Sequence, residues 1–187
     1  MRKIFLGLLL MIFFSLILGK TTQAATQAGT LKAASPTAQP KVNYSLPYPG
    51  ILPDHPLYSL KMLRDRLVDF LIRDPLKKTE FLILMADKRL GAGKTLIESQ
   101  KADLGQTTIN KGEDYLLRAI ETARLAKEQG KDTSGLTEKL ESSIAKHLEV
   151  LGEVLQKAPE QAKPGLQNAL KNSRKGYQRV LELKTQK

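Results

Sequence analysis

The sequence predicts an all-α protein: an antiparallel bundle of four to five helices, preceded by a signal peptide and a disordered linker. From residue 57 onward, apolar residues recur at three- and four-residue spacing, which is the period of an amphipathic helix. No segment alternates apolar and polar residues over a useful length, and no hairpin dipeptide separates two apolar runs. Short connections between long helices favour antiparallel neighbours, and therefore a bundle.

Residues 1–24 are predicted to be a secretory signal peptide. Two basic residues, Arg2 and Lys3, precede the apolar run 4–18, and a small, polar stretch follows it. The run is shorter than the roughly 20 apolar residues that a membrane-spanning helix needs, so we expect cleavage after Ala24. The alternative is an uncleaved N-terminal membrane anchor, with Lys20 at the far interface. Both alternatives predict a protein exported to the cell envelope or the extracellular space.

Residues 25–50 are predicted to form a flexible linker rich in Ala, Thr and Pro. Residues 25–41 contain almost no large apolar side chain, so they cannot bury enough surface to offset the entropy of ordering. Residues 42–56 are rich in proline, which predicts an extended or turning segment before the first helix. The helical bundle domain is therefore assigned to residues 51–187.

The first two helices are separated by a predicted cap at Asp74–Pro75. Asp54 or His55 is expected to cap the first helix, with Pro56 inside its first turn. The periodic residues of this helix are Leu57, Leu60, Leu63, Leu67 and Leu71. The face of the second helix carries Thr79, Ile83, Ala86, Leu90, Gly93 and Ile97. If the first helix is only a short lid, the bundle has four helices.

Three more helices follow. Asp103 and Gln106 resemble a capping box for the third helix, which should stop at Gly130. Thr133 or Ser134 opens the fourth helix, and Pro159 and Pro164 separate it from the last one. The expected apolar faces are Ile109, Leu116, Ala119, Ala123 and Ala126; then Leu140, Ile144, His147, Leu151 and Val154; and finally Leu166, Ala169, Leu170, Tyr177, Val180 and Leu181.

The composition limits the classes of function. The chain has no cysteine, so its stability must come from apolar burial rather than from disulfides. The net charge is +11, and removal of the three basic residues of the signal peptide leaves +8. Aromatic residues make up only 5% of the chain, and export argues against nucleic acid, so a nucleic-acid partner is not expected.

No catalytic pattern stands out, and we predict a protein that is not an enzyme. Gly91-Ala92-Gly93-Lys94-Thr95 resembles the end of a phosphate-binding loop, but Lys88 stands where that loop needs glycine and a helix runs through it. We interpret this stretch as a helical turn where a neighbouring helix packs closely. The carboxylates on the helices, which include Asp65, Asp69, Asp87, Glu121 and Glu138, fit solvated surface pairs with nearby Lys and Arg. No cofactor and no metal site is predicted.

The two histidines, His55 and His147, are too few for an all-histidine zinc site. A mixed site of His147 with Glu149 and Glu153 is conceivable, since these carboxylates are close in sequence. The more common role is a hydrogen-bonded histidine in or near the core. An envelope metal or stress sensor that uses His147 is therefore kept as the alternative function.

A basic stripe on the last helix is the first candidate interaction surface. It consists of Lys171, Arg174, Lys175 and Arg179, opposite the apolar face. Such a stripe could meet an anionic membrane surface, a wall polymer or an acidic protein partner. A solvated face that keeps a basic protein soluble is the alternative interpretation.

The proline-rich segment before the first helix is the second candidate surface. Its residues Leu52, Pro53, His55, Pro56 and Tyr58 form the most distinctive local string in the chain. The expected structural role is a strap that Leu57 and Tyr58 staple onto the bundle. A surface that binds a protein partner is the alternative.

The same string gives a family resemblance. Residues 52–61 read Leu-Pro-Asp-His-Pro-Leu-Tyr-Ser-Leu-Lys, and Asp74–Pro75 and the Ala86–Leu90 element follow in order. This order resembles an uncharacterised family of exported bacterial helical proteins that begin Leu-Pro-x-x-Pro-Leu-Tyr-x-x-Lys. The chain departs from that family at Gly91-Ala92-Gly93 and at Tyr177, where relatives often carry Ala-Glu-Ala and histidine. The resemblance implies a secreted helical domain and supplies no reaction.

From these observations we expect an exported, non-catalytic helical-bundle protein that acts by binding in the cell envelope or outside the cell. The expected partner is an anionic surface or another protein. The sequence does not fix the oligomeric state.

Overall fold

The computed structural model describes residues 42–185. The predicted signal peptide and residues 25–41 of the predicted linker lie outside the described residues. The described part contains α-helices, one 3-10 helix and no strand, so the all-α prediction is confirmed, and none of these helices is long and apolar enough to cross a membrane. The elements are α2 (Tyr58–Leu71), α3 (Pro75–Glu98), α4 (Ala102–Glu128), α5 (Ser134–Lys157), η1 (Glu160–Ala162) and α6 (Lys163–Thr185).

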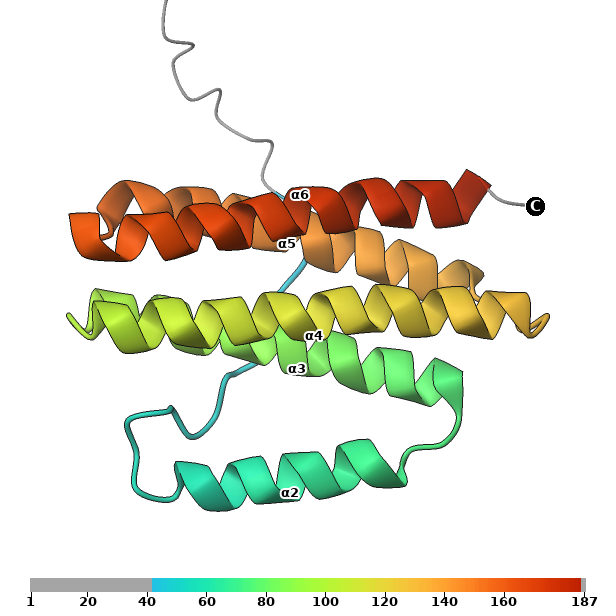
Figure 1. Cartoon of the computed structure of the whole chain (residues 1–187), viewed down its shortest axis with the longest axis horizontal. Coiled ribbons are helices and arrows are strands. Elements are labelled where there is room, and N and C mark those ends of the chain that lie inside the picture. The colour runs from blue at the N-terminus through green and yellow to red at the C-terminus, as the bar shows by residue number, and fades with distance from the viewer. Residues whose placement is uncertain (1–41, 186–187) are drawn as a thin grey trace, which may run out of the picture. The chain divides into compact units, whose positions relative to one another are not determined.

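Helices α3 to α6 form a four-helix bundle (Figure 1). Within it α3 contacts α4 and α5 contacts α6, while α4 also lies against α6 and α3 against α5. Consecutive helices run antiparallel, as the short connections predicted, so the neighbours α4 and α6 run parallel (Figure 1). Helix α2 lies outside the bundle, on the side of α3 (Figure 1).

The helix boundaries confirm some predicted caps and correct others. The Asp74 side chain accepts hydrogen bonds from the backbone N–H groups of Leu76 and Lys77, at 2.9 and 3.0 Å. After α4, Gly130 has a φ of 75°, the left-handed conformation that glycine adopts without strain.

Two predicted caps are wrong. The Asp103–Gln106 capping box does not form, because α4 begins at Ala102 and leaves Asp103 inside the first turn. Neither Asp54 nor His55 is the N-cap of α2: Leu57 holds that position, and Pro56 lies just before it.

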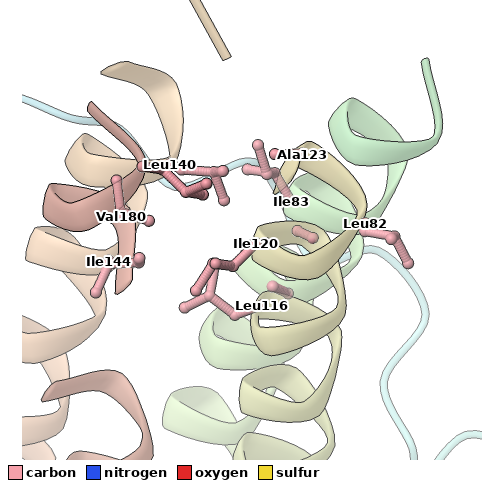
Figure 2. Close-up of a cluster of buried hydrophobic side chains, with 11 residues drawn as sticks. Leu82, Ile83, Leu116, Ile120, Ala123, Leu140, Ile144 and Val180 are labelled. Carbon is pink, nitrogen blue, oxygen red and sulfur yellow. The ribbon is translucent and has the colours of Figure 1, made fainter. Parts of the chain in front are cut away.

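The core lies between the α3–α4 pair and the α5–α6 pair. Figure 2 shows one cluster, in which side chains from all four helices meet. The faces predicted for the second, third and fourth helices are buried, as the helical period requires. The labelled side chains of the cluster are Leu82, Ile83, Leu116, Ile120, Ala123, Leu140, Ile144 and Val180.

Glycines bring α3 and α4 unusually close together. A Cβ atom at Gly93 would lie 2.7 Å from the Gly105 carbonyl oxygen, and one at Gly105 would lie 2.8 Å from that of Gly93. Both distances are shorter than any real carbon contact allows, so each helix needs glycine where the other crosses it. The Gly91–Thr95 stretch is thus helical and closely packed, as we interpreted it, and is not a phosphate-binding loop.

Candidate functional site

Helix α2 exposes its apolar face. The leucines that recur at helical spacing remain largely accessible: Leu60 is 64% exposed, Leu63 63% and Leu67 57%. Phe70 is 78% exposed and lies beside Leu71, which is 63% exposed. A monomeric protein rarely leaves so many large apolar side chains together in water, and such a patch usually marks an interaction site.

The acidic side chains of α2 face the opposite way. Asp65 is buried, and Asp69 is partly buried against the bundle. Asp69 forms ion pairs with Lys78 on α3 at 2.7 Å and with Arg118 on α4 at 3.0 Å. Partial burial raises the pKa of Asp69, but hydrogen bonds and charge from Lys78 and Arg118 outweigh it and hold the pKa below its usual value. Helix α2 therefore attaches to the bundle through polar contacts.

The polar side of α2 also meets the buried guanidinium of Arg89. This group lies 4.4 Å from the centre of the Tyr115 ring, and its Nη2 donates to the Met62 sulfur at 3.1 Å. Among residues 42–185, the buried Arg89 Nε and Asp65 Oδ2 have no hydrogen-bond partner. The buried polar atoms at the interface between α2 and the bundle are thus less completely hydrogen-bonded than those of the bundle core.

The segment before α2 crosses its first turns and encloses a groove. Lys61 Nζ donates to the backbone oxygens of Pro49 and Ile51, at 2.8 and 3.0 Å, which fixes the segment on the helix. The groove has a volume of about 580 Å³. Its lining residues are aliphatic or basic: Pro49, Gly50, Ile51, Leu57, Leu60, Lys61, Leu63, Arg64, Leu67 and Lys88.

The groove concentrates positive charge. Partial burial is the main cause that lowers the pKa of Lys61, and the neighbouring cations Arg89, Lys88 and Arg64 lower it further, although Asp65 opposes them. No acidic side chain of the described part of the chain lines the groove. An occupant with a negative charge would relieve this repulsion.

The predicted basic stripe is solvent-exposed on α6. Lys171, Arg174, Lys175 and Arg179 are all exposed, and within residues 42–185 none of them forms an ion pair. Helix α6 lies on the other side of the bundle from α2, with α4 and α3 between them in the view (Figure 1). The basic stripe on α6 and the apolar face of α2 are therefore separate surfaces.

The residues of the predicted proline-rich surface differ in their exposure to solvent. His55 and Pro56 are exposed, whereas Leu52, Pro53 and Tyr58 are partly buried. The prediction that Leu57 staples the segment onto the bundle is wrong, because its side chain is 53% exposed. The segment is held by polar contacts instead, including an ion pair of 2.6 Å between Asp54 and Lys101.

A cluster of ionisable side chains lies inside the bundle. His147 on α5 is fully buried, with its Nδ1 2.7 Å from Glu113 Oε1 and its Nε2 3.2 Å from Asp87 Oδ1. Ser143 donates to Asp87 Oδ1 at 2.6 Å, and Ser173 donates to Glu113. Each of the four bundle helices thus contributes a side chain to one connected network.

The network holds His147 in its protonated form. Burial alone lowers the pKa of His147, but the charges and hydrogen bonds of Glu113 and Asp87 reverse the effect and raise the pKa to about 9. At neutral pH the imidazolium ring therefore donates both N–H groups to carboxylates. The prediction that Asp65 and Asp87 belong to solvated surface pairs is wrong, since both are buried.

The segment before α2 closes this cluster from outside. The Tyr44 hydroxyl donates to Asp87 Oδ2 at 2.5 Å, and the Val42 N–H donates to Glu149 Oε2 at 2.7 Å. Burial and the neighbouring Asp87 carboxylate raise the pKa of Tyr44. Residues 42–50, which the sequence assigned to the linker, thus contact the bundle directly.

The carboxylates expected near His147 do not meet it. Glu149 accepts hydrogen bonds from Lys146 and Val42, and Glu153 pairs with Lys94. Within residues 42–185, no group of three or more potential ligands is arranged to hold a metal ion. Sequence reasoning missed Glu113, although its spacing from Ile109 and Leu116 placed it on the buried face of its helix.

A family model described as "Domain of unknown function (DUF5667)" matches residues 50–161. The match covers more than half of the chain and includes α2 to α5, but it ends before α6. No curated protein and no solved structure matches the chain. The expected resemblance to an uncharacterised family is confirmed, whereas the opening motif and export remain predictions.

Proposed function

Because the chain belongs to the DUF5667 family, a family of unknown function, we propose a function from the site itself: an exported, non-catalytic protein that docks on an anionic membrane surface through α2. The observation that carries this proposal is the direction of α2, which turns its leucines and Phe70 outward and its carboxylates inward. The place of action is the outer face of a membrane in the cell envelope, or a membrane met outside the cell.

Apolar and basic side chains together favour a lipid surface. A helix that lies in a membrane interface buries its apolar face at the boundary of the acyl chains and places Lys and Arg near anionic headgroups. Arg64 and Arg66 are exposed on α2, and Lys88 lies next to it on α3. Each basic residue near such a surface contributes about 1 kcal/mol of attraction.

Charge argues against a second copy of this chain as the partner. Two α2 faces packed together would bring Arg64, Arg66 and Lys88 of both copies into one interface. Asp65 already pairs with Arg64 at 2.6 Å, and Asp69 pairs with Lys78 and Arg118. No acidic side chain of α2 is therefore left to neutralise Arg66 and Lys88. An anionic partner meets no such repulsion.

The test is co-sedimentation with phosphatidylglycerol and phosphatidylcholine vesicles at low and high salt. The chain from Ala25 onward is suitable, because it retains all described residues and the compact unit Gln39–Lys187. We expect binding to phosphatidylglycerol vesicles that weakens with salt. The double variant Phe70→Ser/Leu71→Ser should bind at least about tenfold more weakly, because it removes two inserted apolar side chains.

A matched variant separates α2 from the predicted basic stripe. Lys171→Gln/Lys175→Gln changes only α6 and should keep vesicle binding within about twofold. If this variant loses binding and the α2 variant keeps it, the α6 stripe is the docking surface and the proposal for α2 is wrong. If the wild-type chain binds no vesicle, the proposal fails, and pull-down on wall polymer becomes the next measurement.

The alternative proposal, an envelope metal or stress sensor, rests on the buried His147 between two carboxylates. Both ring nitrogens already contact carboxylates, so a metal ion would have to displace one of these contacts. Zinc titration monitored by thermal unfolding tests this proposal. A zinc-dependent rise in Tm that His147→Ala abolishes would support the sensor, whereas a response that survives the substitution would contradict it.

A further inference from the structure

We propose that the groove between α2 and the segment before it binds one acyl chain of an anionic lipid, with the negatively charged headgroup between Arg64 and Lys88. This inference rests on the proposed function, since it assigns the lipid that the docked α2 would take up. It goes beyond the proposed function, because α2 could dock on a membrane surface without any groove, whereas the groove would hold a single lipid chain. The volume of about 580 Å³ lies in the range of small-molecule sites.

The lining of the groove selects the chemistry of its occupant. Apart from its basic residues, its walls are leucine, isoleucine, proline and glycine, and no aromatic or neutral polar side chain of residues 42–185 lines them. An occupant made of rings and hydrogen-bonding groups would find neither stacking nor polar partners there. A flexible hydrocarbon chain needs neither, because burial of apolar area alone stabilises it.

The backbone of the groove argues against an extended peptide. An extended peptide binds mainly through main-chain hydrogen bonds to an exposed edge. The carbonyl oxygens of Pro49 and Ile51, on the segment that bounds the groove, already accept hydrogen bonds from Lys61 Nζ. An extended peptide would therefore find these two acceptors already partly used by the contacts that shape the groove.

The charges at the groove favour an anionic headgroup. Among the described residues, Lys61, Arg64 and Lys88 are the only ionisable ones in its lining. Lys61 is occupied by backbone oxygens, and Arg64 contacts Asp65 at 2.6 Å while remaining 64% exposed. The Lys88 side chain forms no ion pair within residues 42–185. A carboxylate or phosphate is the group that completes this arrangement.

The test is equilibrium dialysis with radiolabelled myristate below its critical micelle concentration, and with tetradecyltrimethylammonium as the cationic control. We expect the wild-type chain to bind myristate at one site and to bind the cationic amphiphile at least about tenfold more weakly. The groove variant Leu63→Ser/Leu67→Ser should lose myristate binding. These side chains are exposed, so their substitution should leave the fold intact.

Two matched controls keep the inference separate from the proposed function. Phe70→Ser/Leu71→Ser lies outside the groove lining, so it should weaken vesicle binding and leave myristate binding within about twofold. Lys88→Gln should weaken myristate binding about fivefold, whereas Lys77→Gln, on the same helix outside the groove lining, should not.

The outcomes are distinguishable. Vesicle binding that depends on Phe70 and Leu71, without any myristate binding, overturns the acyl-chain site and leaves the membrane proposal standing. Myristate binding without vesicle binding supports the groove and contradicts docking. Dimers in sedimentation velocity that Leu63→Ser/Leu67→Ser dissociates would show that a second copy covers the groove, and would overturn the inference.

Discussion

In α5 the apolar residues Leu140, Ile144 and Leu151 are fully buried, whereas in α2 the leucines Leu60, Leu63 and Leu67 recur at similar helical spacing and remain more than half exposed. The two helices differ in their partners. Helix α5 packs against α3 and α6, with fewer contacts to α4, whereas α2 is attached to the bundle by ion pairs and a buried arginine. An amphipathic period thus predicts that a helix has an apolar face, but not what covers that face.

The two regions also differ in how their charges are satisfied. In the bundle core, the Asp87 and Glu113 carboxylates share a protonated His147 and accept from serine hydroxyls. At the α2 interface, Asp65 Oδ2 and Arg89 Nε are buried without a partner among the described residues. A buried polar atom without a hydrogen bond costs about 1–3 kcal/mol. The interface of α2 is therefore expected to open more readily than the bundle.

The largest expected difference between the two regions is in how much a leucine side chain contributes to the free energy of unfolding. Leu116→Ala removes a side chain that is 1% exposed in the core and should lower the free energy of unfolding by about 2–5 kcal/mol. Leu63→Ala removes the same atoms from a side chain that is 63% exposed and should change it by less than about 0.5 kcal/mol. Urea unfolding monitored by circular dichroism gives both values. A large loss at Leu63 would mean that the α2 face is covered in solution.

The second effect concerns the pH dependence of the buried network. The pKa of His147 rises from 6.5 to about 9 on folding, so the native state binds this proton more tightly than the unfolded chain does. The stabilisation is complete below about pH 6.5 and is lost as the pH rises through about 9, by on the order of 3 kcal/mol. Urea unfolding at pH 6 and at pH 9.5 measures this loss.

The matched variants for this effect are His147→Gln and His55→Gln. The first should be less stable at pH 6 and should lack the decline between pH 6 and pH 9.5 that belongs to His147. The second replaces an exposed histidine and should keep the wild-type decline. Equal pH dependence in the wild-type chain and His147→Gln would show that the buried ring carries no proton at neutral pH.

Much of the bundle could be predicted from sequence, because its signals are local. The cap at Asp74, the stop at Gly130 and the buried faces of α3, α4 and α5 each follow from a few neighbouring residues. The close approach at Gly93 was also expected, although its partner Gly105 was not. Which residue opposes a glycine depends on the register of two helices, and that register is set by packing along their whole length.

The candidate sites were harder to predict, because they depend on contacts between distant segments. Glu113 and Asp87 come from two other helices than His147, and Tyr44 reaches Asp87 from the segment before α2. The sequence predicted carboxylates close to His147 along the chain, but Glu149 and Glu153 lie on the same helix and turn elsewhere. The exposed leucines of α2 were indistinguishable by period from those of a core helix.

The smallest expected effect concerns the segment that links the two regions. Tyr44→Phe removes the hydroxyl that donates to Asp87 Oδ2 and leaves that buried oxygen with one hydrogen bond fewer. The free energy of unfolding should fall by about 1.5 kcal/mol, the lower end of the range for a hydrogen bond to a charged group, because the site is only partly buried. Tyr48→Phe is the matched control, because Tyr48 is 83% exposed and should be neutral. Hydrogen exchange should also rise at residues 42–50 in Tyr44→Phe and stay unchanged in α4. If both tyrosine variants behave alike, Tyr44 does not fix the segment, and the groove beside α2 must be held by other contacts, which include those of Lys61 and the Asp54–Lys101 ion pair.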